Sequence, residues 1–202
     1  MGLNQLGVHA IRDETLLFDI RDKLVERHGA ERISQLGDEY ILRVIATLKV
    51  RASPRSRCSS AIVQLTHYDG AQGRMQLTSD LIERSDYFFQ EPKYDATDDS
   101  KQLKLKATKP NTAAVLEAAR EALERLPPND TDSPFTADTI AAALKVVASD
   151  PKLGIKLNEL WLALRYVLTA TSVGAEVPKT IATLGRSATL ARLQAYLSKR
   201  AS

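Results

Sequence analysis

The sequence predicts an all-α fold, and three observations support this prediction. Apolar residues recur at helical spacing over nearly the whole chain of 202 residues. No segment shows the sustained alternation, the glycine-rich phosphate loop or the strand–helix rhythm that a sheet protein would need. Proline, glycine and capping threonines separate the helical stretches. With 44% apolar and 26% charged residues, the composition is ordinary for a soluble globular protein.

The first part of the chain is expected to hold two helices and then an irregular segment. Asp13 can cap the first helix, and Gly29 ends it. A longer helix follows until Ser53-Pro54 interrupts it. Residues 52–77 are the least regular part, and they fit either a short strand pair or a disordered insertion. The apolar residues expected to point inward are Leu17, Ile20, Leu24, Ile33, Leu36, Tyr40, Ile41, Val44, Ile45 and Leu48.

The rest of the chain is expected to be helical with short loops. A short helix near Leu81 leads to the aromatic run Tyr87-Phe88-Phe89, which we interpret as core, and then to a loop over residues 91–95. Trp161 belongs to a continuous apolar stripe and is also interpreted as core. The later helices are expected at residues 112–126, from Thr136 to before Pro151, and at 156–170, 178–184 and 187–199.

The helices are expected to form two domains. Breaks near residues 107–111 or 127–134 would divide the chain, and we place the boundary between residues 1–107 and residues 108–202. The first part would be a helical pair with its irregular segment. The second would be a compact helical bundle.

The distribution of charge is more informative than its total. The net charge of +3 is weak, but residues 151–202 contain eight basic and two acidic residues. A second run, between Glu39 and Asp69, contains five basic residues and no acid. Such concentrations can follow a phosphate backbone. The alternative for each run is an ordinary solvated face.

Several function classes lack support in the sequence. Cys58 is the only cysteine, so no intrachain disulfide can form. No stretch approaches the roughly 20 apolar residues of a membrane-spanning helix. Residues 1–12 lack the features of a signal peptide or presequence. We therefore expect no membrane partner, and a monomer.

No catalytic constellation is apparent either. The three histidines are far apart and lack the spacing of metal ligands, and no serine lies in a nucleophile elbow. The acidic pairs Asp98-Asp99 and Asp130–Asp132 are interpreted as polar loops. We predict no catalytic residue, no metal site and no cofactor in this chain.

Motifs in a fixed order nevertheless resemble the C-terminal anticodon-binding region of the glutamyl-tRNA synthetases. They begin with Leu3-Asn4-Gln5-Leu6 and His9, continue with residues 80–89, Pro92 and Tyr94-Asp95, and end in the last fifty residues. Residues 51–76 have no clear counterpart. The matching late positions are Leu160, Leu164, Arg165, Leu168, Thr169, Gly174, Leu184, Gly185, Arg192 and Leu193.

The resemblance implies a tRNA partner, with glutamate tRNA expected, and a set of binding residues. In the family an all-helical cage opens the anticodon loop and reads unstacked bases. Arg165 matches an arginine that faces the anticodon, and Gly174, Ala175 and Val177 match the loop beside it. An arginine that reads the first anticodon base is matched by Arg74, for which Arg51 or Arg57 could substitute. The residues implied in tRNA binding are therefore Arg165, Gly174, Ala175, Val177 and Arg74.

The sequence departs from the family pattern beside this predicted site. Ala170 replaces a glycine, Ala175 replaces a proline, and Arg186-Ser187 replaces Lys-Glu. Glycine and proline fix unusual backbone angles, so these changes bear on the loop at residues 170–178. They motivate a second interpretation, in which the chain is a helical scaffold or partner-binding module without RNA reading. A third is the similar cage of class I lysyl-tRNA synthetases.

The full-length family uses ATP and magnesium in a catalytic half that this sequence does not show. Neither its His-x-Gly-His turn nor its Lys-Met-Ser-Lys loop occurs here in a suitable context. Residues 197–200 are similar to the second signature, and we interpret this similarity as a coincidence. We therefore expect an anticodon-binding half that does not activate glutamate by itself. The loose match to the bacterial pattern favours an organellar, mitochondrial enzyme, with the bacterial cytoplasm as the alternative.

Overall fold

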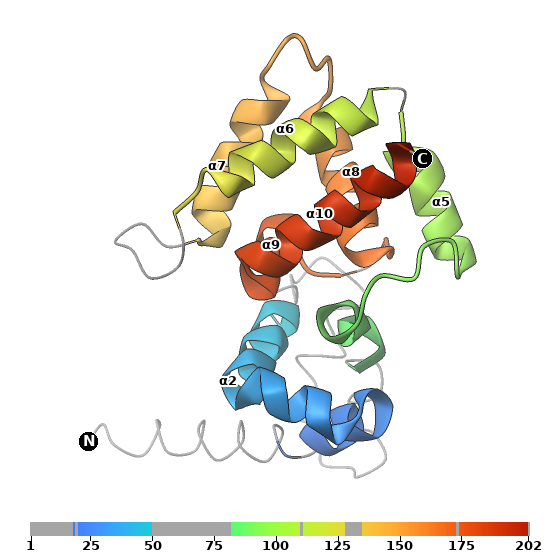
Figure 1. Cartoon of the computed structure of the whole chain (residues 1–202), viewed down its shortest axis with the longest axis vertical. Helices are drawn as coiled ribbons and strands as arrows, with labels where there is room; N and C mark the ends of the chain where they lie inside the picture. The colour runs from blue at the N-terminus through green and yellow to red at the C-terminus, as the bar shows by residue number, and fades with distance from the viewer. Residues whose placement is uncertain are drawn as a thin grey trace. The chain divides into compact units, whose positions relative to one another are not determined.

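The computed structural model describes residues 18, 20–49, 82–109, 111–127, 135–172 and 174–201 (Figure 1). Within these ranges every regular element is an α-helix and no strand occurs, which confirms the all-α prediction. The predicted irregular segment at 52–77 lies outside the described residues. The helices are residues 20–28, α2 (Ala30–Lys49), residues 82–89, α5 (Asp98–Ala107), α6 (Thr112–Glu124), α7 (Ala137–Ala148), α8 (Leu157–Thr169), α9 (Val177–Leu184) and α10 (Arg186–Ala201).

The chain divides into two compact units, Met1–Gln90 and Glu91–Ser202. This boundary comes earlier than the expected one after residue 107. The reason is α5, a helix that the sequence patterns did not predict. It packs most extensively on α8 and therefore belongs with the second unit.

The first unit has a core formed by helix 20–28, α2 and helix 82–89. Its buried residues include Ile20, Ile41 and Phe89, and the aromatic run Tyr87-Phe88-Phe89 is buried throughout, as predicted. The hydroxyl of Tyr40 donates a hydrogen bond to the carbonyl of Phe88 (2.9 Å), which ties α2 to helix 82–89. Gly29 ends the first helix with a positive φ of 88°, again as predicted.

The second unit is organised around α8, which contacts all five of the other helices, α5, α6, α7, α9 and α10. Leu160, Leu164 and Leu168 on α8 are fully buried, so the predicted apolar stripe is the centre of this core. The prediction that Trp161 belongs to the core is wrong, because the structure leaves its side chain half-buried.

Local signals set the ends of the helices in this unit. Thr136 caps α7 by accepting from the amide of Thr139, while the hydroxyl of Thr139 accepts from the amide of Thr136. Gly185 follows α9 with a φ of 82°, as expected for a helix terminator. None of the described helices has both the length and the apolar character needed to cross a membrane.

Candidate nucleic-acid interface

The candidate site lies where α8 ends and the chain turns toward α9. Ala170 follows the last residue of α8 with φ 51° and ψ 20°, the left-handed conformation that glycine adopts most easily. A side chain in this conformation costs roughly 1–2 kcal/mol. Ala170 therefore keeps a backbone geometry suited to glycine although the residue is alanine. The surrounding contacts must hold it there.

The backbone carbonyls at the carboxyl end of α8 have hydrogen-bond donors. Helices leave their last carbonyls without partners inside the helix, and these groups need donors from elsewhere. Four successive carbonyls near the end of α8 accept hydrogen bonds, two from the helix's own last residue and its C-cap and two from side chains elsewhere in the unit. They are the carbonyls of Arg165 (from Thr169 Oγ1, 2.8 Å), Tyr166 (from the Ala170 amide, 3.0 Å), Val167 (from the Tyr94 hydroxyl, 2.6 Å) and Leu168 (from Arg192 Nη1, 2.8 Å).

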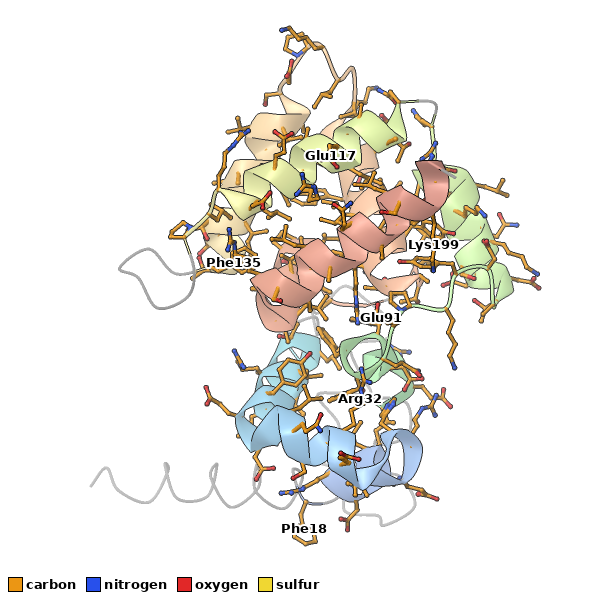
Figure 2. The ribbon with its side chains drawn as sticks, in the orientation of Figure 1. Phe18, Arg32, Glu91, Glu117, Phe135 and Lys199 are labelled. Atoms are coloured by element: carbon orange, nitrogen blue, oxygen red, sulfur yellow. The ribbon has the colours of Figure 1, made fainter. Side chains whose placement is uncertain are left out.

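Two of these donors come from distant segments that matched the family motifs. Arg192 is only 5% exposed, and its Nε lies 3.4 Å from Oε2 of Glu91, which Figure 2 labels. The ring of Tyr94 lies 5.4 Å from that of Tyr166 and 5.7 Å from that of Tyr196, between ring centres. Burial raises the pKa of Tyr94 to about 12, so its hydroxyl stays a donor at neutral pH. These residues position α8 from inside the unit.

Asp99, in the first turn of α5, holds the loop that follows Ala170. Its carboxylate accepts hydrogen bonds from the Ser172 amide (2.8 Å), the Ser172 hydroxyl and the Thr171 hydroxyl (3.3 Å). Burial by itself would raise the pKa of Asp99, but these hydrogen bonds and the charge of Lys106 outweigh it and lower the pKa. The loop is thus tied to a second helix.

Arg165 and Ala175, two of the predicted site residues, come together in the structure. Nη2 of Arg165 donates a hydrogen bond of 2.9 Å to the carbonyl of Ala175, and the arginine side chain is half-buried. Of the acids in this unit, Glu159 pairs with Lys109 and Glu176 pairs with Lys179. Arg165 therefore spans the loop from α8 to the start of α9.

The other predicted residues beside this loop are buried. Gly174 is buried, the side chain of Ala175 is 2% exposed and that of Val177 is 5% exposed. Ala175 and Val177 therefore pack inward and shape the loop, while Arg165 has exposed surface. Arg74 lies outside the described residues. Their contact with tRNA stays a prediction.

Other features bear on what the site can do. Trp161 and Leu162, both half-buried, precede Arg165 by four and three residues and so share its face of α8. A guanidinium has five donors in a rigid fork, a geometry that suits a base edge or a phosphate. Over the described ranges, no three His, Cys, Asp or Glu side chains are grouped so that they could hold a metal ion. The arrangement favours recognition of a base or phosphate.

Sequence patterns missed Asp99, because Asp98-Asp99 was interpreted as a polar loop. The available signal was Thr97, whose hydroxyl caps α5 by accepting a hydrogen bond from the amide of Ser100 (3.1 Å). Two acids, Asp98 and Asp99, follow it in the first turn, where negative charge is favourable. This signature predicts a helix, but it does not predict that Asp99 turns toward the loop at residues 171–172.

Comparisons with known proteins identify related sequences. A glutamate–tRNA ligase of Roseiflexus castenholzii is 32% identical over 184 residues, which cover 88% of this chain and 33% of the ligase. One from Streptomyces avermitilis is 32% identical over 130 residues, or 64% of this chain and 23% of the ligase. The chain thus spans about a third or less of the length of these relatives.

The fold also has a solved counterpart. A crystal structure of a glutamate tRNA ligase from Elizabethkingia meningosepticum, in complex with its amino acid, has a TM-score of 0.63 and 19% identity. The match covers 96% of this chain and 31% of that one, so it supports the fold. Residues 23–197 match the model of a family described as an anticodon binding domain. The chain therefore belongs to the anticodon binding domain family found in glutamate–tRNA ligases.

Proposed function

We propose that this chain binds the anticodon loop of a tRNA, and specifically of glutamate tRNA, as the anticodon-binding part of a glutamate–tRNA ligase. The observation that carries the proposal is the bond from Arg165 Nη2 to the Ala175 carbonyl, 2.9 Å long. It holds a partly exposed arginine at the loop between α8 and α9. Family membership over residues 23–197 makes RNA the appropriate partner.

The proposed chemistry assigns different tasks to the parts of this surface. Arg165 contacts a base edge or phosphate through the fork of its guanidinium. Trp161 and Leu162 offer half-buried apolar surface one turn away, against which an unstacked base can pack. Ala175 and Val177 act through the shape of the loop, because their side chains face the core.

The substitution Arg165→Ala tests this proposal. We expect it to weaken binding of glutamate tRNA by about 1–3 kcal/mol, the range for a good base contact. Binding is measured by a titration at fixed salt, with circular dichroism to verify that the variant folds. Arg125→Ala is the matched control, since Arg125 is an exposed arginine paired with Glu121 on α6 (2.8 Å). It should leave tRNA affinity unchanged.

A helical scaffold without RNA reading is the competing function. The departures at Ala170 and Ala175, and the burial of Ala175, favour it. Phosphate contacts give an affinity that falls steeply with salt. Binding of tRNA by the unmodified chain that is absent or insensitive to salt would favour the scaffold. Preference for lysine tRNA over glutamate tRNA would instead favour a class I lysyl-tRNA synthetase.

The activity of a whole ligase is part of the proposal and needs its own test. In such a ligase the anticodon-binding part would couple anticodon identity to ATP-dependent attachment of glutamate. We expect this chain alone to show no glutamate-dependent exchange between ATP and pyrophosphate, because the sequence carries neither nucleotide-binding signature. Exchange by the chain alone would contradict that part of the proposal.

A further inference from the structure

Basic side chains cluster near the amino end of α8, at the other end of the helix from Arg165. Segments 109–111, 150–159 and 199–201 contain five basic residues and two acidic ones. The basic residues are all exposed, and Figure 2 labels one of them, Lys199, near the end of α10. We call this surface the basic end, and it consists of Lys109, Lys152, Lys156, Lys199 and Arg200.

Hydrogen bonds and an ion pair between the segments show that these residues are neighbours in space. Nη2 of Arg200 donates to the carbonyl of Lys109 (3.4 Å), which joins the end of α10 to the segment before α6. Lys109 in turn pairs with Glu159, whose other oxygen accepts from the amide of Lys156 (3.2 Å). The side chain of Asn111 donates to the carbonyl of Leu153, next to Lys152. The basic end is therefore one continuous surface of three segments.

Helix stability explains only part of this charge. Cations near the carboxyl end of a helix are favourable, and Lys199 and Arg200 lie in the last turn of α10. Lys152 and Lys156 are different, because they precede α8 and Lys156 is its N-cap residue. A cation is unfavourable at a helix amino end. Glu159, in the first turn of α8, attracts Lys156 electrostatically, but neither lysine makes an ion-pair contact with an acid among the described residues.

We propose that the basic end binds the phosphate backbone of RNA, at phosphates outside the anticodon loop. This inference rests on the proposed function. Lys156 lies about 14 Å from Arg165 along the axis of α8, at roughly 1.5 Å per residue. An RNA whose loop bases meet Arg165 can thus place other phosphates at the basic end. Contacts of this kind supply affinity and orientation without reading sequence.

The test measures the salt dependence of tRNA binding for the double variant Lys152→Gln/Lys156→Gln. Each lost phosphate contact lowers the slope of log affinity against log salt by roughly 0.7–0.9, so the pair should lower it by about 1.5. We expect the affinity at low salt to fall together with the slope. Lys152→Arg/Lys156→Arg should keep both the slope and the affinity. Lys145→Gln, an exposed lysine on α7, is the control for a single lost charge.

The outcomes separate this inference from the proposed function. If the unmodified chain binds no tRNA, the proposed function fails and the inference falls with it. If it binds tRNA but the double variant keeps the same slope and affinity, the inference alone is wrong. A second measurement uses an oligonucleotide with the loop sequence and no stem. The double variant should bind it as well as the unmodified chain does. An equal loss on this oligonucleotide would overturn the placement of the contact outside the loop.

Discussion

The two ends of α8 are held in contrasting ways. At the carboxyl end, four successive carbonyls accept hydrogen bonds, and two of the donors come from Tyr94 and Arg192, far away in the sequence. At the amino end, Lys152 and Lys156 are exposed and make no ion-pair contact with an acid among the described residues. The first end consists of directional contacts with fixed geometry, and the second consists of exposed charges.

The contrast matches the two tasks of RNA recognition. Reading a base requires a donor held in a defined place, while attracting a phosphate backbone requires only charge near the surface. Arg165 extends from the fixed end, and the basic end lies at the other. We infer that substitutions at the carboxyl end change stability and specificity, whereas substitutions at the amino end change affinity and its salt dependence.

The largest effect is expected at Arg192. Arg192→Met keeps the aliphatic stem but removes the donor to the Leu168 carbonyl, leaving that buried group without its charged partner. A hydrogen bond to a charged group contributes about 1.5–3 kcal/mol, so the free energy of unfolding should fall by that amount. Urea unfolding measures it. Lys199→Met, on the exposed face of the same helix, should change stability by less than about 0.5 kcal/mol. Equal losses of unfolding free energy in both variants would contradict the special role of the Arg192 hydrogen bond.

Asp99→Ala should have a smaller effect that depends on pH. The folded pKa of Asp99 is lowered from its ordinary value of 3.8, so the charged carboxylate is favoured in the folded state. Its contribution is complete above the unfolded pKa and is lost as the pH falls through the lower, folded pKa. We expect a loss of about 1 kcal/mol at neutral pH and a shrinking difference below about pH 4.

Asp98→Ala is the control for this prediction. Asp98 lies in the same first turn of α5, but its side chain is 97% exposed and pairs with Lys101. The two variants thus remove the same charge from the same helix end. Only Asp99→Ala should loosen the loop at residues 171–172. Parallel pH profiles for the two variants would show that Asp99 acts as an ordinary helix-end charge.

Ala170→Gly should have the smallest effect, and a favourable one. Glycine avoids the cost of roughly 1–2 kcal/mol for a side chain in the left-handed conformation. The greater freedom of glycine in the unfolded chain offsets about 0.5–1 kcal/mol. We therefore expect a net gain of about 0.5–1 kcal/mol, visible as a higher midpoint of thermal unfolding. Ala142→Gly, at an exposed position inside α7, should lose about 1 kcal/mol. A loss at both positions would contradict the conformation of Ala170.

Sequence patterns predicted the helices with strong apolar periodicity and clear caps. The stripe of α8 was correct because Leu160, Leu164 and Leu168 recur every four residues, and α7 was correct because Thr136 is a good cap. Helix α5 was missed because it buries few side chains, chiefly Leu103 and Ala107, and is otherwise largely polar and charged. A helix that contributes so little to the core leaves a weak periodic signal.

The site was harder to predict than the fold. The approach of Arg165 to Ala175 follows the turn at Ala170. An alanine does not itself predict a left-handed conformation, and the one indication was the glycine that the family pattern has at this position. The tie from Asp99 to Ser172 joins segments far apart in the sequence, so no local pattern predicts it. The family resemblance predicted Arg165 as a binding residue, but its contact with the Ala175 carbonyl became apparent only from the structure.

The most direct test of base reading is a double-mutant cycle between Arg165 and the anticodon. Affinity is measured for the unmodified chain and for Arg165→Ala, each with glutamate tRNA and with a tRNA in which one anticodon base is replaced. If Arg165 reads that base, the two changes should be coupled by about 0.5–3 kcal/mol at one anticodon position. Losses that simply add at every anticodon position would contradict base reading by the carboxyl end of α8.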